Sequence, residues 1–313
     1  MAEKIATREA YGNALAEFGE KYDIVVLDAD LAAATKTGVF KKKFPERFFD
    51  CGIAEGNMVS VAAGLAAAGK IPFASSFAMF TAGRAYEQIR NSIGYPHLNV
   101  KIGATHAGIS VGEDGATHQC NEDIATMRSI PGMTIINPAD ATEARAAVEA
   151  AIKYYGPVYL RFGRLATPVL FDKETYKFEL GKGVKMVDGK DVTIIATGLT
   201  VAMALDAAEL LKAEGVSARV INIHTIKPLD RDIVIAAAKE TGAIVVAEEH
   251  SIIGGLGSAV CECLSETVPT PVIRLGTNDV FGKSGKATVL LEEFGFTPAN
   301  IAAKAKAAMA LKK

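Results

Sequence analysis

Two histidines and two acidic residues lie close together in one glycine-rich stretch of the chain, residues 103–119. His106 and His118 stand on either side of Glu113 and Asp114, and the residues between them show no helical spacing. A stretch this rich in glycine and titratable groups has few apolar side chains to bury in a core and several polar side chains that can contact a ligand. Imidazoles and carboxylates offer hydrogen-bond donors and acceptors whose charge changes near neutral pH. The pattern fits the binding of a polyhydroxylated substrate, and it fits equally a surface loop with incidental histidines.

Three further charged residues stand where a strand or a helix is expected to begin or end. Arg8 falls in the first turn of a predicted helix, where the helix dipole disfavours a cation unless an anion binds nearby. Asp30 follows a β-branched run at the end of a strand, where open α/β sheets bind ligands. Glu55 lies at a strand-to-helix junction. An exposed arginine and a favourable first-turn charge are the simpler interpretations of Arg8 and Glu55.

Two aromatic residues and one arginine also follow predicted strands. Phe77 and Phe80 come directly after the run 71–76, and their spacing lets both rings face the same way at the start of a helix. They could stack on a flat cofactor ring, although packing in the core is the more common role of such a pair. Arg164 lies just beyond the run 158–161. These side chains join the candidates for a binding site.

Strands and helices alternate along the chain, which places the candidates at strand ends. Short apolar runs predict strands, and apolar residues three or four apart predict helices. Such alternation is typical of parallel sheets covered by helices on both faces. We therefore predict an α/β fold with two doubly wound, mostly parallel-sheet domains, 1–172 and 173–313. The predicted strands are 23–28, 48–51, 71–76, 98–102, 134–137, 158–161, 191–196, 218–222, 243–247 and 272–275, and the predicted helices are 7–18, 55–68, 83–92, 122–128, 141–153, 200–214 and one after 254–257.

The composition describes a globular protein and excludes several classes of function. Hydrophobic residues make up 50% of the 313 residues and charged residues 22%, which is enough for two cores. The net charge of −2 gives no broad attraction to nucleic acid or to an anionic membrane. No apolar run reaches the length of a membrane span, and the first residues lack the layout of a signal peptide. With four cysteines and no disulfide pattern, a cytoplasmic protein is expected.

Several stretches of the sequence match a known functional motif only in part. The string Gly282-Lys-Ser284 lacks the glycine five positions earlier that a phosphate-binding P-loop needs. Cys261 and Cys263 have the wrong separation for a zinc knuckle. His106 and His118 are not at the i, i+4 spacing of a helical zinc pair. We therefore predict no metal site in this chain.

The order of its short motifs makes the whole chain resemble the carboxyl-terminal two-thirds of transketolase, the thiamine-diphosphate enzyme of sugar-phosphate metabolism. The second half resembles the C-terminal domain of that family, most clearly at residues 226–229 and 276–285. Each motif is weak by itself, whereas the set in this order is specific. The motifs of the first half are Ala6-Thr-Arg-Glu-Ala-Tyr-Gly12, Asp28-Ala-Asp-Leu31, Gly52-Ile-Ala-Glu-Gly-Asn-Met58, Ser76-Phe-Ala-Met-Phe80, Arg84-Ala-Tyr-Glu-Gln-Ile-Arg90, Gly112-Glu-Asp-Gly-Ala-Thr-His-Gln119 and Asn137-Pro-Ala-Asp140.

The resemblance implies thiamine diphosphate and Mg²⁺ as cofactors and gives roles to the matching residues. It implies that Glu55 is catalytic, because the matching glutamate hydrogen-bonds the cofactor pyrimidine and promotes its active tautomer. Phe77 and Phe80 are implied to line or stack on that ring, and Asp30 to lie in the cofactor site. The cofactor supplies the electron sink, and the protein supplies placement and electrostatics.

The same resemblance implies a phosphorylated sugar as the substrate. His106, Asp114 and His118 match residues that hold sugar hydroxyls, and the two histidines are implied to be catalytic by steadying a developing alkoxide. Arg8 and Arg164 match positions that grip the substrate phosphate, a task suited to the planar guanidinium. The implied activity is transfer of a two-carbon ketol unit from a ketose phosphate to an aldose phosphate.

The amino-terminal domain of the family binds the diphosphate and Mg²⁺ through a G-D-G…N motif, and no G-D-G occurs in this sequence. Because the cofactor lies between that domain and the one resembled here, the chain is expected to supply half a site. We therefore expect a split transketolase whose partner is an N-terminal, diphosphate-binding subunit. Dimerisation of such pairs would give an α2β2 heterotetramer.

Two positions depart from the family pattern. Ala34 stands where the family usually has a phosphate-binding serine, and Thr35 beside it could take over that role. The segment between Phe80 and Arg84 is one residue longer than in the family, which leaves the placement of Phe80 on the cofactor ring open.

Three alternative functions remain open on the sequence. The β subunit of a 2-oxoacid dehydrogenase shares the architecture and the glutamate, and a 1-deoxyxylulose-5-phosphate-synthase-like enzyme would join pyruvate to a triose phosphate. The string from Gly112 to Gln119 and the paired arginines favour a phosphorylated sugar over a 2-oxoacid. A non-catalytic subunit would have no chemical need for Glu55. The sequence leaves open the preferred sugars, the identity of the partner, and whether the pathway is the pentose phosphate pathway or a specialised one.

Overall fold

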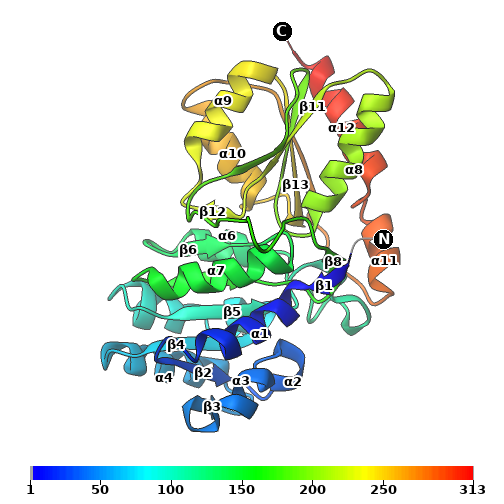
Figure 1. The fold of residues 1–313 in the computed structure, drawn as a ribbon. Coiled ribbons are helices and arrows are strands. Elements are labelled where there is room, and N and C mark those ends of the chain that lie inside the picture. Colours follow the sequence, from blue (N-terminus) through cyan, green and yellow to red (C-terminus); the bar gives the residue numbers. More distant parts are fainter. Residues whose placement is uncertain (1–2, 313) are drawn as a thin grey trace.

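The computed structural model describes residues 3–312 as two α/β domains, one above the other in Figure 1. The first half of the chain forms the lower domain, and the second half forms the upper one. The strands of the first half are β1 (Lys4–Ala6), β2 (Ile24–Asp28), β3 (Phe48–Asp50), β4 (Ile71–Phe77), β5 (Lys101–Thr105), β6 (Thr134–Ile136), β7 (Val158–Arg161) and β8 (Ala166–Pro168). Its α-helices are α1 (Thr7–Phe18), α2 (Ala32–Thr35), α3 (Gly38–Lys43), α4 (Glu55–Ala67), α5 (Tyr86–Gln88), α6 (Asp123–Arg128) and α7 (Ala141–Lys153).

Tighter and wider helical turns complete the first half, and the second half follows after β8. The 3₁₀ turns are η1 (Pro45–Arg47) and η4 (Ile109–Asp114), and the π-helical turns are η2 (Phe80–Arg84) and η3 (Ile89–Gly94). The second half contains β9 (Val184–Val187), β10 (Val192–Ala196), α8 (Thr200–Ala213), β11 (Ala218–Asn222), β12 (Thr225–Lys227), α9 (Arg231–Thr241), β13 (Ile244–Ser251), α10 (Leu256–Ser265), β14 (Val272–Thr277), α11 (Ala287–Glu293) and α12 (Pro298–Ala310). The predicted domain division near Asp172 falls between β8 and β9 and stays a prediction.

The prediction of two doubly wound, mostly parallel sheets is confirmed. The first sheet has the strand order β12-β6-β7-β5-β4-β2-β3, and only the β12–β6 pair is antiparallel. The second sheet has the order β14-β13-β10-β11-β9, and only β9 runs antiparallel to its neighbour. Strands β1 and β8 form a separate antiparallel pair.

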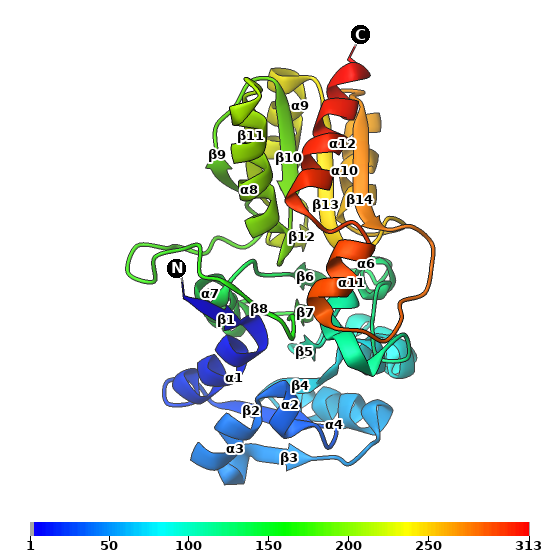
Figure 2. The same cartoon turned by 90° about the vertical axis from the view of Figure 1, so that its right-hand side faces the viewer.

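Helices cover both faces of each sheet. The buried side chains between helices and sheets form three hydrophobic clusters. Helices α1 and α7 pack on one face of the first sheet, where Tyr11, Phe18 and Phe73 are fully buried. Helices α8 and α12 cover one face of the second sheet (Figure 2). The third cluster runs from α4 and the remaining face of the first sheet through to α9 and α10, so one apolar core continues across the domain junction.

One predicted strand was wrong in its position. Residues 98–102 were expected to form a strand because their apolar residues alternate, whereas the strand is Lys101–Thr105. Strand β5 lies between β4 and β7 and is buried on both faces, so alternation is not its signature. Asn99 instead precedes the strand and accepts a hydrogen bond from the buried Lys101 ammonium at 2.6 Å.

The second half of the chain supplies one strand of the first sheet. Strand β12 pairs with β6, and Thr225 lies opposite Ile136. The chain passes from β11 through β12 before it returns to the second domain at α9 (Figure 1). The two domains are therefore joined through a shared sheet as well as through the connecting segment.

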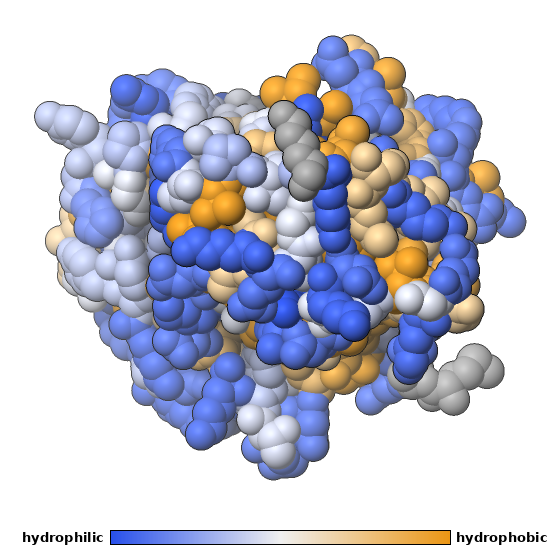
Figure 3. Space-filling view, turned by 90° about the horizontal axis from the view of Figure 1, so that it is seen from above, coloured by the Kyte–Doolittle hydropathy of each residue, from blue (hydrophilic) through white to orange (hydrophobic). Residues whose placement is uncertain are grey.

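The end of the molecule formed by the second domain has a mainly hydrophilic surface with separate hydrophobic patches (Figure 3). Among residues 3–312, no helix combines the length and the apolar character needed to cross a bilayer.

Candidate functional site

His106 lies at the centre of the candidate site, directly after β5, in a left-handed backbone conformation with φ of 56°. Its Nε2 atom lies 3.2 Å from the Arg8 guanidinium, and its Nδ1 atom lies 2.9 Å from the Thr105 hydroxyl. Since a guanidinium can only donate, Nε2 must accept and Nδ1 must carry the proton. Burial lowers the pKa of His106 to about 3, and the Arg8 charge adds to this effect. His106 is therefore held as one neutral tautomer at physiological pH.

Arg8 and Arg164 bring two guanidinium groups close to this imidazole. Arg8 donates to the carbonyl of Ala34 at 2.8 Å, and its Nε atom has no hydrogen-bond partner within residues 3–312. Arg164 donates to Glu113 at 2.9 Å and to the carbonyl of Val111. Burial lowers the pKa of Arg8 from its usual value, and the charge of Arg164 contributes to the same direction. Two neighbouring cations with a spare donor are typical of an anion site.

Four aromatic rings lie side by side at the ends of two neighbouring parallel strands. Phe77, the last residue of β4, is paired in register with Thr105 of β5, which places its ring next to His106. The rings of Phe77 and His106 stack with centroids 3.8 Å apart, and Phe80 lies 5.7 Å from Phe77. His118 meets Phe80 edge-on at 5.2 Å. The structure thus brings the two predicted phenylalanines and both histidines together.

Glu55 reaches the same site from the first turn of α4. Only 4% of its side chain is exposed, and its Oε1 atom accepts a hydrogen bond from Arg84 at 3.1 Å. The Arg84 guanidinium also lies 4.1 Å from the centre of the Phe80 ring. Contacts are therefore continuous from Glu55 through Arg84 and Phe80 to Phe77 and His106.

Phe80 and Arg84 are the first and last residues of the π-helical turn η2, and the extra residue expected between them relative to the family stays a prediction. A π turn closes a hydrogen bond over five residues and holds one more residue than an α turn. The turn ends at Arg84, so the wider turn sets the position from which the guanidinium reaches Glu55.

Asp30, Asp114 and Thr35 take no part in this series of contacts. Asp30 and Asp114 are exposed, and neither carboxylate hydrogen-bonds another residue in the described part of the chain. Thr35 is buried, and its hydroxyl donates to Asp28 at 2.7 Å and contacts Thr37 at 3.0 Å. The suggestion that Thr35 replaces the phosphate-binding serine of the family stays a prediction, and in this structure its hydroxyl is engaged in the turn after β2. The cofactor role of Asp30 and the substrate role of Asp114 stay predictions.

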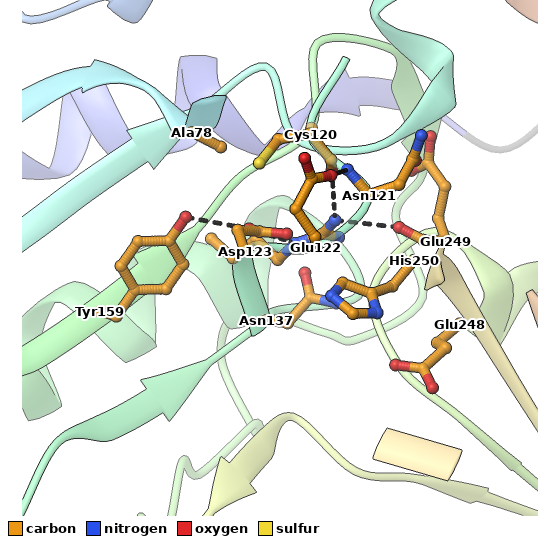
Figure 4. Close-up of polar contacts among 12 residues, drawn as sticks. Ala78, Cys120, Asn121, Glu122, Asp123, Asn137, Tyr159, Glu248, Glu249 and His250 are labelled. Carbon is orange, nitrogen blue, oxygen red and sulfur yellow. Dashed lines mark hydrogen bonds and ion pairs between the residues drawn. The ribbon is translucent and has the colours of Figure 1, made fainter. Parts of the chain in front are cut away.

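A second polar group lies at the junction of the two domains, outside the residues predicted from the sequence (Figure 4). Arg161 and Asp123 form a buried ion pair at 2.8 Å, and the Tyr159 hydroxyl donates to the same carboxylate at 2.9 Å. Arg161 also donates to the backbone carbonyl of Glu249 at 2.9 Å. Burial raises the pKa of the Glu249 carboxyl to about 7. The sequence pattern could have identified Glu249 as a candidate, since it follows an apolar strand pattern as Asp30 does.

The arrangement around Glu55 can hold a flat, nitrogen-bearing ring. The planar guanidinium of Arg84 already lies on the Phe80 ring while it donates an N–H to Glu55. A heteroaromatic ring with a suitable nitrogen would make the same two kinds of contact. Residues 3–312 contain no group of three or more His, Cys, Asp or Glu side chains arranged to hold a metal ion.

Comparison with known families assigns both halves of the chain. Residues 3–169 match the family model described as "Transketolase, pyrimidine binding domain". Residues 181–301 match the model described as "Transketolase, C-terminal domain".

Similar proteins span nearly the same length. A protein named as a transketolase C-terminal section from Methanocaldococcus jannaschii is 52% identical, covering 94% of this chain and 93% of its own length. A 6-deoxy-6-sulfo-D-fructose transketolase subunit from Clostridium sp. is 46% identical, covering 94% and 91%. A solved structure described as a split gene transketolase, inactive beta4 tetramer, aligns with a TM-score of 0.93 and 55% identity, covering 99% of this chain and all of that one.

Proposed function

The chain belongs to the transketolase family, and we propose that it is the pyrimidine-binding subunit of a two-subunit transketolase. The proposed reaction transfers a two-carbon ketol unit from a ketose phosphate to an aldose phosphate. Thiamine diphosphate and Mg²⁺ are the proposed cofactors, with the diphosphate and the metal held by a partner subunit.

The observation that carries this proposal is the unbroken series of contacts from Glu55 to His106. It joins a buried carboxylate, two phenylalanine rings and an imidazole, which come from α4, β4 and the segment after β5. A structure with Glu55 remote from Phe77 and the histidines would have argued against the proposal. The series supports a single site that serves both a cofactor ring and a substrate.

Glu55 is the residue proposed to act on the cofactor. When bound, thiamine diphosphate supplies a thiazolium that stabilises a carbanion. Glu55 would hydrogen-bond a pyrimidine nitrogen, and its 4% exposure would keep water from competing for that bond. Phe77 and Phe80 would hold the ring by stacking. Arg84 must release Glu55 for this contact to form.

The substrate is proposed to bind beside the neutral imidazole of His106. His106 and His118 would hydrogen-bond sugar hydroxyls and stabilise the negative charge that develops on one of them. Arg8 and Arg164 would hold the anionic end, since Arg8 has a spare Nε donor and both cations lie near His106. Asp114 is proposed to contact a hydroxyl. A relative named for a sulfonated sugar shows that a phosphate is not the sole anion to test.

The proposed partner is an N-terminal transketolase subunit that binds the diphosphate. Relatives that span the same length are named as a section or a subunit of a transketolase, which supports a division into two chains. The outer face of α4 is free of charge from Gly56 to Ala67, and Ile53 just before it is 77% exposed. An uncharged surface beside Glu55 favours an interface at this position. We propose an α2β2 assembly.

Reconstitution tests the proposed function. The chain would be combined with the diphosphate-binding subunit, Mg²⁺ and thiamine diphosphate, and supplied with a ketose phosphate donor and an aldose phosphate acceptor. We expect ketol transfer by the assembled complex and none by either chain alone. Glu209→Gln, on the exposed face of α8, is the matched control for Glu55→Gln.

The substrate consumed separates the proposal from its alternatives. Consumption of pyruvate together with a triose phosphate, but not of the ketose, would identify a synthase instead. Transfer of an acyl group from a 2-oxoacid to lipoamide would identify a dehydrogenase subunit. A complex that binds thiamine diphosphate and turns over none of these substrates would indicate a non-catalytic subunit.

A further inference from the structure

The second domain contacts the segment that carries both histidines of the candidate site. We call residues 106–119 the histidine segment. The loop between β14 and α11 extends from the second domain down to this segment in Figure 2. The carboxyl end of β13 reaches it as well, through the side chain of Glu249.

Glu249 makes a deeply buried contact with the histidine segment. Its Oε1 atom accepts a hydrogen bond from the backbone N–H of Ser110 at 2.5 Å, and only 4% of the residue is exposed. Gly108 has a φ of 82°, and a Cβ atom there would lie 2.4 Å from the Glu249 carboxyl carbon. The segment therefore passes directly against the carboxylate, at a residue where any side chain would collide.

Strand β13 and Arg161 fix Glu249 in place. Glu248 and Glu249 follow one another at the end of the strand, and their side chains point in opposite directions (Figure 4). Arg161 donates to the backbone carbonyl of Glu249 at 2.9 Å and is itself held by the ion pair with Asp123. Because a buried ion pair fixes Arg161 and Arg161 bonds the Glu249 backbone, Glu249 presents its carboxylate from a rigid support.

A second contact holds the other end of the histidine segment. The Gln119 side-chain amide donates to the carbonyl of Lys283 at 2.9 Å. Gly282 lies so close that a Cβ atom there would be 1.8 Å from the Gln119 Oε1 atom. The second domain thus holds the segment at Ser110, shortly after His106, and at Gln119, next to His118.

We propose that Glu249 is a positioning residue that holds the histidine segment so that His106 and His118 face the same site. A buried N–H group is costly without an acceptor, so the Ser110 backbone would leave this position if Glu249 lost its oxygen. Small displacements of positioned groups cost large factors in rate. The structural part of this proposal applies to the chain alone, and its catalytic part rests on the proposed function.

Two substitutions of Glu249 separate its hydrogen bond from its charge. Glu249→Gln keeps an acceptor oxygen for Ser110, whereas Glu249→Leu has a similar size and no acceptor. Hydrogen–deuterium exchange of the isolated chain would be followed in peptides that cover residues 106–119. We expect Glu249→Leu to speed exchange there by roughly tenfold or more, and Glu249→Gln to stay close to the wild type. Peptides from β10 and the exposed control Glu209→Leu should show no change.

A second variant covers the case in which Glu249→Leu fails to fold, as judged by circular dichroism. Gln119→Leu removes the donor to Lys283 together with the donors to the carbonyls of Ile109 and Gly112, and it should speed exchange across residues 109–119. In the reconstituted complex, Glu249→Leu should lower kcat by roughly tenfold to a hundredfold, and Glu249→Gln should restore most of it.

Unchanged exchange of residues 106–119 in folded Glu249→Leu would overturn the proposal. Equal effects of the glutamine and leucine variants would also overturn it, because they would indicate a role for charge rather than for the hydrogen bond. If the wild-type complex transferred no ketol unit, the proposed function would fail, and the exchange result would still decide whether Glu249 positions the segment.

Discussion

The guanidinium of Arg84 donates to the Glu55 carboxylate at 3.1 Å, in the position where a cofactor ring would have to approach. The carboxylate is 4% exposed and the arginine 54% exposed, so the cation closes the site from its solvent side. A half-exposed partner adds little to stability, because solvent screens the charge. Arg84 therefore protects a buried carboxylate in the free chain without binding it so strongly that the contact cannot be broken.

Replacing Arg84 by Gln should tighten cofactor binding. The wild type must break the pair with Glu55 before a ring can take its place, at a cost of about 1 kcal/mol or less. Removing the arginine should strengthen thiamine diphosphate binding to the assembled complex by a few-fold, up to roughly fivefold. Isothermal titration of the cofactor measures the change, with the exposed Arg90→Gln as control. Weaker binding in Arg84→Gln would instead indicate that the guanidinium contacts the cofactor.

Replacing Glu55 by Gln should remove activity while leaving the fold intact. The glutamine has the same size and can still bond Arg84 through its oxygen, but it is a poor proton acceptor. Loss of general acid–base catalysis should lower kcat of the complex by about 10²- to 10⁴-fold. Steady-state ketol transfer and circular dichroism together measure this effect. Activity within a factor of ten of the wild type would exclude Glu55 from the chemistry.

Replacing Arg8 or Arg164 by Gln should weaken binding of the anionic end of the sugar. A lost charge-assisted hydrogen bond costs about 1.5–3 kcal/mol, which corresponds to roughly 10- to 150-fold in KM. A sugar without its phosphate should be affected little by either change, since it lacks the group that the arginines hold. Kinetics with the two sugars as paired substrates provide the measurement. Equal losses for both sugars would contradict an anion site at these residues.

His106 should remain neutral well below the usual range of histidine. Burial and the positive charges of Arg8 and Arg164 lower its pKa to about 3, so NMR titration of the folded chain should show no protonation of His106 between pH 8 and pH 5. The unfolded chain protonates near its ordinary pKa of about 6.5. Between these values the unfolded state binds more protons, and the free energy of unfolding falls as the pH decreases.

The variant His106→Gln, which lacks the titrating imidazole, is the matched control for the pH dependence of the free energy of unfolding. Below about pH 6.5, the wild type should lose up to roughly 1.4 kcal/mol per pH unit relative to the glutamine variant, until the folded histidine itself protonates. Denaturant unfolding of both proteins at several pH values measures the difference. Parallel curves would show that His106 titrates equally in the folded and unfolded chains.

The sequence predicted the sheets from local patterns, and it selected the candidate site residues from local patterns together with the family resemblance. Apolar runs bounded by polar residues located β2, β4, β7 and β11, and the apolar spacing of residues 141–153 located α7. The structure adds that Asp140 caps the first turn of α7 by accepting from the Glu143 N–H at 2.8 Å. The glycine-rich, titratable stretch 103–119 selected His106, and the spacing of two aromatic residues after a predicted strand selected Phe77. The register of β4 and β5 brings these two residues into contact.

The rest of the site depends on tertiary contacts that leave little trace in a local pattern. Strand β5 was displaced by three residues because a strand buried on both faces does not alternate. Glu249 lies more than a hundred residues from the Ser110 N–H that it binds, so its role follows only from the packing of the two domains. The π turn that ends at Arg84 was not predicted, because residues 83–92 were expected only as a helix.

Strand β12 has a consequence for how this protein can change during evolution. Its residues follow β9, β10, α8 and β11 of the second half in the chain, yet they complete the sheet of the first half at β6. A gene cut near the connecting segment would encode a first half whose β6 edge is uncovered, and uncovered strand edges recruit other chains. Domain shuffling at this boundary would therefore produce aggregation unless the incoming module supplied its own matching strand, so the two halves are expected to be inherited as one unit.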